Sequence, residues 1–272
     1  KKLKEIDFNE SRINVDGAQL LLSGLVKLQE DIYTDIDFKL NKPNFDLIFA
    51  ALPHEASMKM NEYTTTGDIG FSGRMNGFIT KDQWPDFSVI YECVDGKIIH
   101  SASKQTIDKI NFQFDIQNNE YFQHIKLNHF HAENHNSSMN IDFELQDFSN
   151  PYFQLDILSD VDLSFLSEFS GEVNLLDGLG GHFQMSSHLE DSLYIENPED
   201  MINTMLDKLD IDLHCKNVHI PGLDGYEKHK IDLDVVLKDN ALNLSNLSIK
   251  AKDSDLKLSG RIDSIYQFIH GS

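Results

Sequence analysis

Four histidines and one glutamate in a short stretch of the chain are the side chains best suited to metal binding. They are His124, His129, His131, Glu133 and His135. His129 and His131 are two residues apart, so a β-strand would point both imidazoles to one face, with Glu133 beside them. No second pair of ligands follows at a fixed spacing, and a polar strand face would need the same residue types. We predict no metal site, and His129, His131 and Glu133 are the residues to check.

Paired aspartates recur along the chain and could supply acid–base chemistry. They are Asp35/Asp37, Asp160/Asp162, Asp210/Asp212, Asp232/Asp234 and Asp253/Asp255. Catalytic carboxylates flank a cleft in glycosidases, whereas these pairs follow the alternation of neighbouring apolar residues and indicate water-facing strand surfaces. None matches a calcium-binding loop, and the sequence has no Gly-x-Ser-x-Gly or Gly-Lys-Ser/Thr motif. We therefore expect no catalytic residues, no cofactor and no enzyme activity.

The elements that hold these side chains are strands, because apolar residues alternate with polar ones along most of the chain. Examples are Ile110 to Ile116, Ile141 to Leu145 and Phe153 to Ile157. This period of two predicts strands with one apolar and one wet face, which antiparallel sheets tolerate. Asp-Gly and Asp-Asn pairs between the runs, such as Asp95-Gly96 and Asp239-Asn240, favour tight hairpin turns. We predict a mainly β fold, a long antiparallel meander with a few short helices.

Three segments are predicted to be helical: residues 45–52, 162–169 and 198–206. An alternating strand followed by a short helix occurs three times, at residues 35–53, 153–169 and 254–269, which indicates a sheet built from loose repeats. We treat residues 1–272 as one elongated segment with a possible subdivision near 170–198.

The composition excludes several classes of partner. Lys+Arg is 23 against 45 Asp+Glu, a formal charge of −22, which argues against binding to nucleic acid or to anionic lipid headgroups. No apolar run approaches the length of a transmembrane helix, and no signal-peptide core follows the first lysines. The two cysteines, Cys93 and Cys215, have no metal-binding spacing; free thiols and a disulfide both remain open.

Several motifs, taken in order, resemble the AsmA family of bacterial envelope proteins over nearly the whole chain. The motifs are residues 17–24, 35–40, 45–53, 67–73, 84–91, 239–249, 252–262 and 265–269. The last three resemble the C-terminal region of Bacteroidetes-type members in particular. Within the fifth motif, Trp84 precedes Pro85; we interpret Trp84 as an anchor at a strand start, with a ligand-binding aromatic as the alternative.

The resemblance implies a fold, a location and a function. AsmA-like proteins are anchored in the inner membrane by an N-terminal helix and extend a β-groove through the periplasm. They are implicated in phospholipid transport to the outer membrane and in outer-membrane assembly, and they are not known as enzymes. This chain would then be a soluble segment on the periplasmic side of the inner membrane, attached through an anchor that the sequence lacks. Its partners would be phospholipid acyl chains, the inner membrane and other envelope proteins, with no nucleic acid.

A sheet with one apolar face must cover that face, and short helices offer little cover. We expect the meander to curl into an open groove whose apolar side chains solvate acyl chains, at about 0.8 kcal/mol per buried CH₂. The alternative is a sealed β-sandwich that acts as a structural or protein-interaction module of the cell envelope. The candidate groove residues are Ile36, Phe38, Leu40, Phe112, Phe114, Ile141, Phe143, Leu145, Phe153, Leu155, Ile157, Leu233, Val235, Leu244, Leu256 and Leu258.

Overall fold

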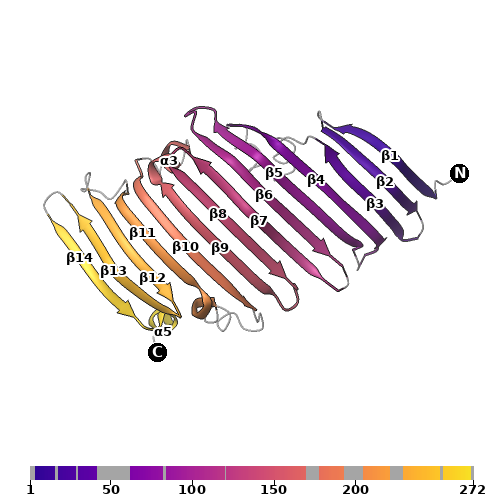
Figure 1. Ribbon diagram of the computed structural model, residues 1–272. Helices are drawn as coiled ribbons and strands as arrows, with labels where there is room; N and C mark the ends of the chain where they lie inside the picture. The colour runs from indigo at the N-terminus through magenta and orange to yellow at the C-terminus, as the bar shows by residue number, and fades with distance from the viewer. Residues whose placement is uncertain are drawn as a thin grey trace.

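Fourteen strands pair in strict sequence order to form one antiparallel sheet (Figure 1). The computed structural model describes residues 4–15, 18–28, 30–41, 62–81, 84–119, 121–169, 178–192, 205–220, 229–251 and 254–270. The strands are β1 (Glu5–Val15), β2 (Ala18–Leu28), β3 (Ile32–Asn41), β4 (Tyr63–Ile79), β5 (Asp86–His100), β6 (Thr106–Asn118), β7 (Gln123–Asn134), β8 (Ser137–Gln146), β9 (Tyr152–Asp162), β10 (Gly180–Ser192), β11 (Asp210–His219), β12 (Lys230–Lys238), β13 (Ala241–Lys250) and β14 (Asp255–Ile262). The predicted mainly β antiparallel meander is confirmed.

The helices are short and follow strands. Helix α3 (Leu163–Phe169) comes directly after β9, and the carboxylate of Asp162 accepts hydrogen bonds from the backbone N–H and hydroxyl of Ser164, which caps its first turn. Helix α5 (Ile265–His270) follows β14. Strand-then-helix order is thus confirmed for two of the three predicted units. The helix predicted at residues 45–52 lies outside the described residues. The helix predicted at residues 198–206 lies outside them except for residues 205 and 206, which belong to a helical turn at residues 205–208.

The sheet is open and is not strongly curled (Figure 1). The expectation that the meander curls into an open groove is therefore corrected to an open sheet without strong curl. Right-handed twist spreads gradually from strand to strand, and bulges add local twist without closing the sheet. The described strands all belong to this one sheet, so they do not form the sealed two-sheet sandwich either. Strands β9 and β10, on either side of the possible subdivision, pair directly with each other.

Turn chemistry is only partly as predicted. Asp239 and Asn240 form the turn between β12 and β13, both with positive φ, as a tight hairpin turn requires. The prediction of a turn at Asp95-Gly96 is wrong, because both residues lie inside β5 at a shift in its register with β6. Asp95 has φ 50°, so the residue type that suits a turn here serves a β-bulge instead.

The best-buried apolar cluster lies on β4 to β7. Ile69, Cys93, Ile110 and Ala132 form it, and the partly buried Phe112 and Phe130 pack against it. Burial raises the pKa of the Cys93 thiol to about 11, so this cysteine is not a reactive thiolate at neutral pH. Cys93 and Cys215 are both free. They lie six strands apart, about 29 Å at the usual strand spacing, far beyond the reach of a disulfide.

In the part of the chain that the structure describes, no helix is both long enough and apolar enough to cross a membrane.

Candidate functional site

The strand register places all sixteen candidate groove residues on one face of the sheet, called the apolar face below. Directly opposed residues on antiparallel strands share a face, so the face can be followed from strand to strand. Phe143 opposes Leu155, for example, and Leu233 opposes Leu247, which opposes Leu258. Fourteen of the sixteen side chains are half-buried, while Leu256 and Leu258 on β14 are exposed. The apolar face therefore runs across the whole sheet, and none of its predicted residues is fully buried.

Aromatic rings order part of the apolar face before any ligand arrives. Tyr91, Phe112 and Phe130 form a run across β5, β6 and β7, with successive ring centroids 5.2 and 6.2 Å apart. Phe143 and Phe153 meet edge to face at 5.3 Å. Such pairs fix ring orientation beyond what area burial alone would do. An apolar ligand would thus meet a largely preformed surface.

Helix α3 converts one part of the apolar face into a pocket of about 320 Å³. Its Phe165 and Leu166 line this pocket together with side chains of β5 to β9. The pocket falls in the size range of small-molecule sites and is lined mainly by apolar groups, with Glu133, Asn134, Ser137 and Ser138 at its margin. The apolar lining residues are Ile98, Ile107, Ile110, Phe112, Phe130, Ala132, Met139, Val161, Phe165 and Leu166.

Nine of the ten apolar lining residues are absent from the predicted set, and four of them lie beside bulges, where the period of two breaks: Ile98, Ile107, Ile110 and Phe130. Ile107 and Ile110 are three residues apart, as are Leu127 and Phe130, yet in each case both members lie on the apolar face. The same step of three occurs from Cys215 to Val218 and from Leu244 to Leu247. An apolar spacing of three between two alternating runs is therefore the signal that could have located them.

Two of these bulges and the β5 bulge at Asp95 share one hydrogen-bonding pattern. The bulge residues Asp95, His129 and Asn217 have φ of 50°, 51° and 52°. Each donates its backbone N–H to a side-chain oxygen on the next strand. The acceptors are Asn111 at 3.0 Å, Asp142 at 2.7 Å and Asp232 at 2.8 Å respectively. Polar side chains thus hold the irregularities that keep apolar residues on a single face.

The opposite surface, called the polar face below, carries the paired aspartates. Charged side chains pair across neighbouring strands there, as in Arg74–Asp35 at 2.9 Å, Lys126–Glu144 at 2.9 Å and Lys238–Asp210 at 2.8 Å. The predicted water-facing role of the aspartates is confirmed for all but Asp253, which lies outside the described residues. These carboxylates line an extended strand surface in cross-strand pairs.

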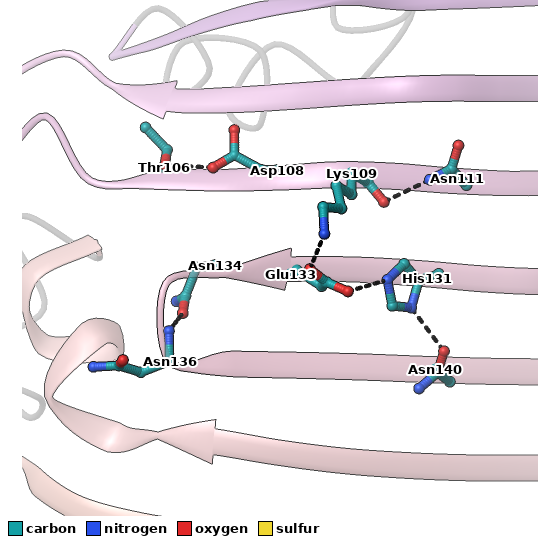
Figure 2. A network of polar contacts seen from close by, with 9 residues as sticks. All are labelled: Thr106, Asp108, Lys109, Asn111, His131, Glu133, Asn134, Asn136 and Asn140. Carbon is teal, nitrogen blue, oxygen red and sulfur yellow. Dashed lines mark hydrogen bonds and ion pairs between the residues drawn. The ribbon is translucent and has the colours of Figure 1, made fainter.

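Three histidines of the cluster have separate carboxylate partners: His124 lies near Glu144, His129 near Asp142 and His131 near Glu133, and Figure 2 shows the contacts of His131. His131 places Nε2 2.9 Å from a Glu133 oxygen and Nδ1 2.8 Å from the Asn140 side-chain oxygen. The other oxygen of Glu133 accepts a hydrogen bond from Lys109 at 2.7 Å, and this contact, with that of His131, lowers the pKa of Glu133. His129 is the bulge residue of β7, and its ring is 91% exposed. Within the described residues, no three His, Cys, Asp or Glu side chains are grouped as metal ligands.

Trp84 lies just before β5 but does not anchor it, because 75% of its surface is exposed. The adjacent Pro85 is buried instead. The interpretation of Trp84 as a strand anchor is therefore wrong.

Comparison with known proteins finds nothing similar: no family model, no curated protein and no solved structure matches this chain.

Proposed function

We propose that this chain is a non-enzymatic lipid-binding segment whose apolar face solvates acyl chains. The observation that carries the proposal is the apolar face itself, which continues across fourteen strands with half-buried side chains. Apolar patches on soluble monomers are normally a few hundred Å² in area, and larger ones mark binding surfaces. A surface without directional hydrogen-bonding groups suits a ligand that is itself apolar and flexible.

The total accessible surface supports the same proposal. The chain exposes 17,722 Å², whereas a compact globular protein of 272 residues exposes about 12,000 Å². A single-layer sheet leaves both faces in contact with solvent, and the excess area reflects this. Covering the apolar part of that surface gains roughly 25 cal/mol per Å². A bound acyl chain is one way to obtain that gain without a second protein layer.

The α3 pocket is the part of the face where a chain would be held best. Its lining makes contact from two sides, the strands and the helix, so each methylene loses more water there than on an open sheet. Eight buried methylenes would contribute about 6 kcal/mol. We propose a shallow open groove, with α3 as one wall, in place of a deep trough.

The location and transport role remain part of the proposal. The resemblance of the sequence motifs to AsmA-like proteins supports a location on the periplasmic side of the bacterial inner membrane. There it would assist phospholipid movement toward the outer membrane. The acidic polar face would keep the long sheet soluble and discourage pairing of its edges.

The test is lipid binding by the purified chain. We expect co-purifying phospholipid in mass spectra of its organic extract, and uptake of a fluorescent fatty acid after the lipid has been washed out. Phe143→Glu puts a charge on the apolar face and should weaken fatty-acid binding at least tenfold, because the carboxylate must be desolvated under the ligand. Ala132→Phe should fill the α3 pocket and weaken binding of the acyl chain that we propose is held there.

The matched control is Leu158→Glu, which adds the same charge to the polar face of β9. Leu158 is 58% exposed, and its neighbours along the strand, Ile157 and Ser159, lie on the apolar face. This variant should bind fatty acid like the wild type. A washed chain that neither carries phospholipid nor takes up the fatty acid would remove the proposal, as would equal losses in Phe143→Glu and Leu158→Glu.

A further inference from the structure

Exposed aromatic side chains gather along one long edge of the sheet. Because successive strands run in opposite directions, the hairpins that follow even-numbered strands all lie at the same edge, together with α5 (the lower edge in Figure 1). We call this the aromatic edge and define it by Phe78, Trp84, Tyr121, Phe122, Phe148 and Phe268, all of which are exposed.

Three neighbouring hairpins present the most prominent of these rings. Trp84 precedes β5, Tyr121 lies between β6 and β7, and Phe148 lies between β8 and β9. Successive hairpins on one edge are two strands apart, so these rings recur about every 10 Å. Tyr121 is 89% exposed, although Asn119 accepts hydrogen bonds from the backbone N–H groups of Tyr121 and Phe122 and orders that turn. The edge therefore holds aromatic rings in water at regular intervals.

The opposite edge differs in composition. Its described turns are polar, with Ser101 to Gln105 between β5 and β6, and His135 and Asn136 between β7 and β8. The exposed large hydrophobic residues near that edge, among the residues that the structure describes, are aliphatic: Ile13, Leu166, Ile220 and Leu256. Aromatic exposure is thus a property of one edge and not of turns in general.

We propose that the aromatic edge docks on the surface of a zwitterionic phospholipid bilayer. Trp and Tyr favour the headgroup level of membranes, since their rings are amphipathic. The formal charge of −22, with Asp31, Asp86 and Asp147 at this edge, opposes binding to anionic lipid, so a zwitterionic surface is the lipid surface that fits.

The apolar face reaches the same edge, which ties docking to lipid handling. Ile32 opposes Ile79 on the apolar face at the ends of β3 and β4, and both are exposed. An acyl chain that leaves a bilayer at this edge would meet apolar side chains at once. Docking on a bilayer goes beyond the proposed binding of acyl chains, and each of these two proposals can be wrong while the other is right.

The chain contains one tryptophan, Trp84, so its fluorescence reports on the aromatic edge directly. With phosphatidylcholine vesicles we expect a blue shift of Trp84 emission and quenching by brominated phosphatidylcholine. Replacing Tyr121, Phe122 and Phe148 together by Ser should lower vesicle partitioning at least tenfold in a flotation assay. The same variant should take up fluorescent fatty acid like the wild type in the absence of vesicles, which separates docking from binding at the apolar face.

The control is the double variant Ile13→Ser and Ile220→Ser at the opposite edge, which should bind vesicles like the wild type. Circular dichroism of both variants should match the wild type, because all five side chains are exposed. Three results would overturn the proposal: unchanged Trp84 emission with phosphatidylcholine vesicles, preference for anionic vesicles, or equal partitioning of the two variants. A blue shift that grows with protein concentration without lipid would assign the edge to a second copy of the chain and would overturn it as well.

Discussion

The two faces of this sheet are stabilised in different ways. Side chains of the polar face find their partners within the sheet, as His214 does with Asp234 at 2.7 Å and Lys109 with Glu133 at 2.7 Å. Side chains of the apolar face pack against neighbours on the same surface, and many stay half-buried, because the described residues supply α3 as a cover for only part of it. Much of the polar face is thus paired within the sheet, whereas the apolar face gains further from anything apolar that covers it.

This difference bears on which face is the better candidate for binding. Cross-strand ion pairs at an exposed surface contribute little free energy each and leave few groups free for a ligand. Apolar burial is additive over area and does not depend on direction, so a long apolar surface can hold a long flexible molecule in many positions. Binding is therefore expected to respond to charge on the apolar face and to tolerate it on the polar face.

The largest effect on stability should come from a charge placed on the buried part of the apolar face. Leu189 in β10 is 2% exposed and opposes Leu155. Leu189→Asp should lower the free energy of unfolding by about 4 kcal/mol, since a carboxylate would be buried without a partner. Leu158→Asp on the polar face of β9 should change it by less than about 0.5 kcal/mol. Urea denaturation of both variants measures the difference, and similar midpoints would show that the two faces are not distinct.

The difference between the faces could be predicted from sequence because it is local. A period of two assigns every second residue to one surface, and all sixteen candidate groove residues do share a surface. The curl of the sheet could not be predicted, because it sums small twists over fourteen strands and no single motif encodes it. The α3 pocket was missed since bulges shift the phase between Ile107 and Ile110 and between Leu127 and Phe130, and since its lining combines side chains of five strands with those of α3. Trp84 was misassigned because its sequence context, a tryptophan before proline, does not report exposure.

An intermediate effect is expected from the acceptors that hold the bulges, because the bulges keep the two faces sorted. Asp142→Ala leaves the backbone N–H of His129 without its acceptor, and Asp232→Ala does the same for Asn217. Each change should lower the free energy of unfolding by about 1 kcal/mol, the usual net value of one hydrogen bond. Asp37→Ala is the control, because Asp37 is exposed and its ion pair with Arg74 is long, at 3.8 Å. Equal urea midpoints for Asp37→Ala, Asp142→Ala and Asp232→Ala would deny the bulges this role.

The smallest effect is a pH dependence that belongs to the polar face alone. The hydrogen bond to Asp234 raises the pKa of His214, and the same bond lowers the pKa of Asp234. A raised histidine pKa stabilises the folded state fully below the unfolded pKa, near 6.5, and this stabilisation is lost as the pH rises through the folded value. His214→Gln should therefore be less stable than the wild type at pH 5.5, by well under 1 kcal/mol because water screens the half-exposed pair, and nearly equal to it at pH 8.5. Urea midpoints at both pH values measure this gap in stability between His214→Gln and the wild type.

Salt provides the control for this prediction. Because the contact is an ion pair at the surface, 1 M NaCl should shrink the gap at pH 5.5, whereas the loss of stability in Leu189→Asp should persist in salt. A gap that is independent of pH and salt would mean that His214 stabilises the sheet by packing, and that the polar face does not rely on charge pairing at this position.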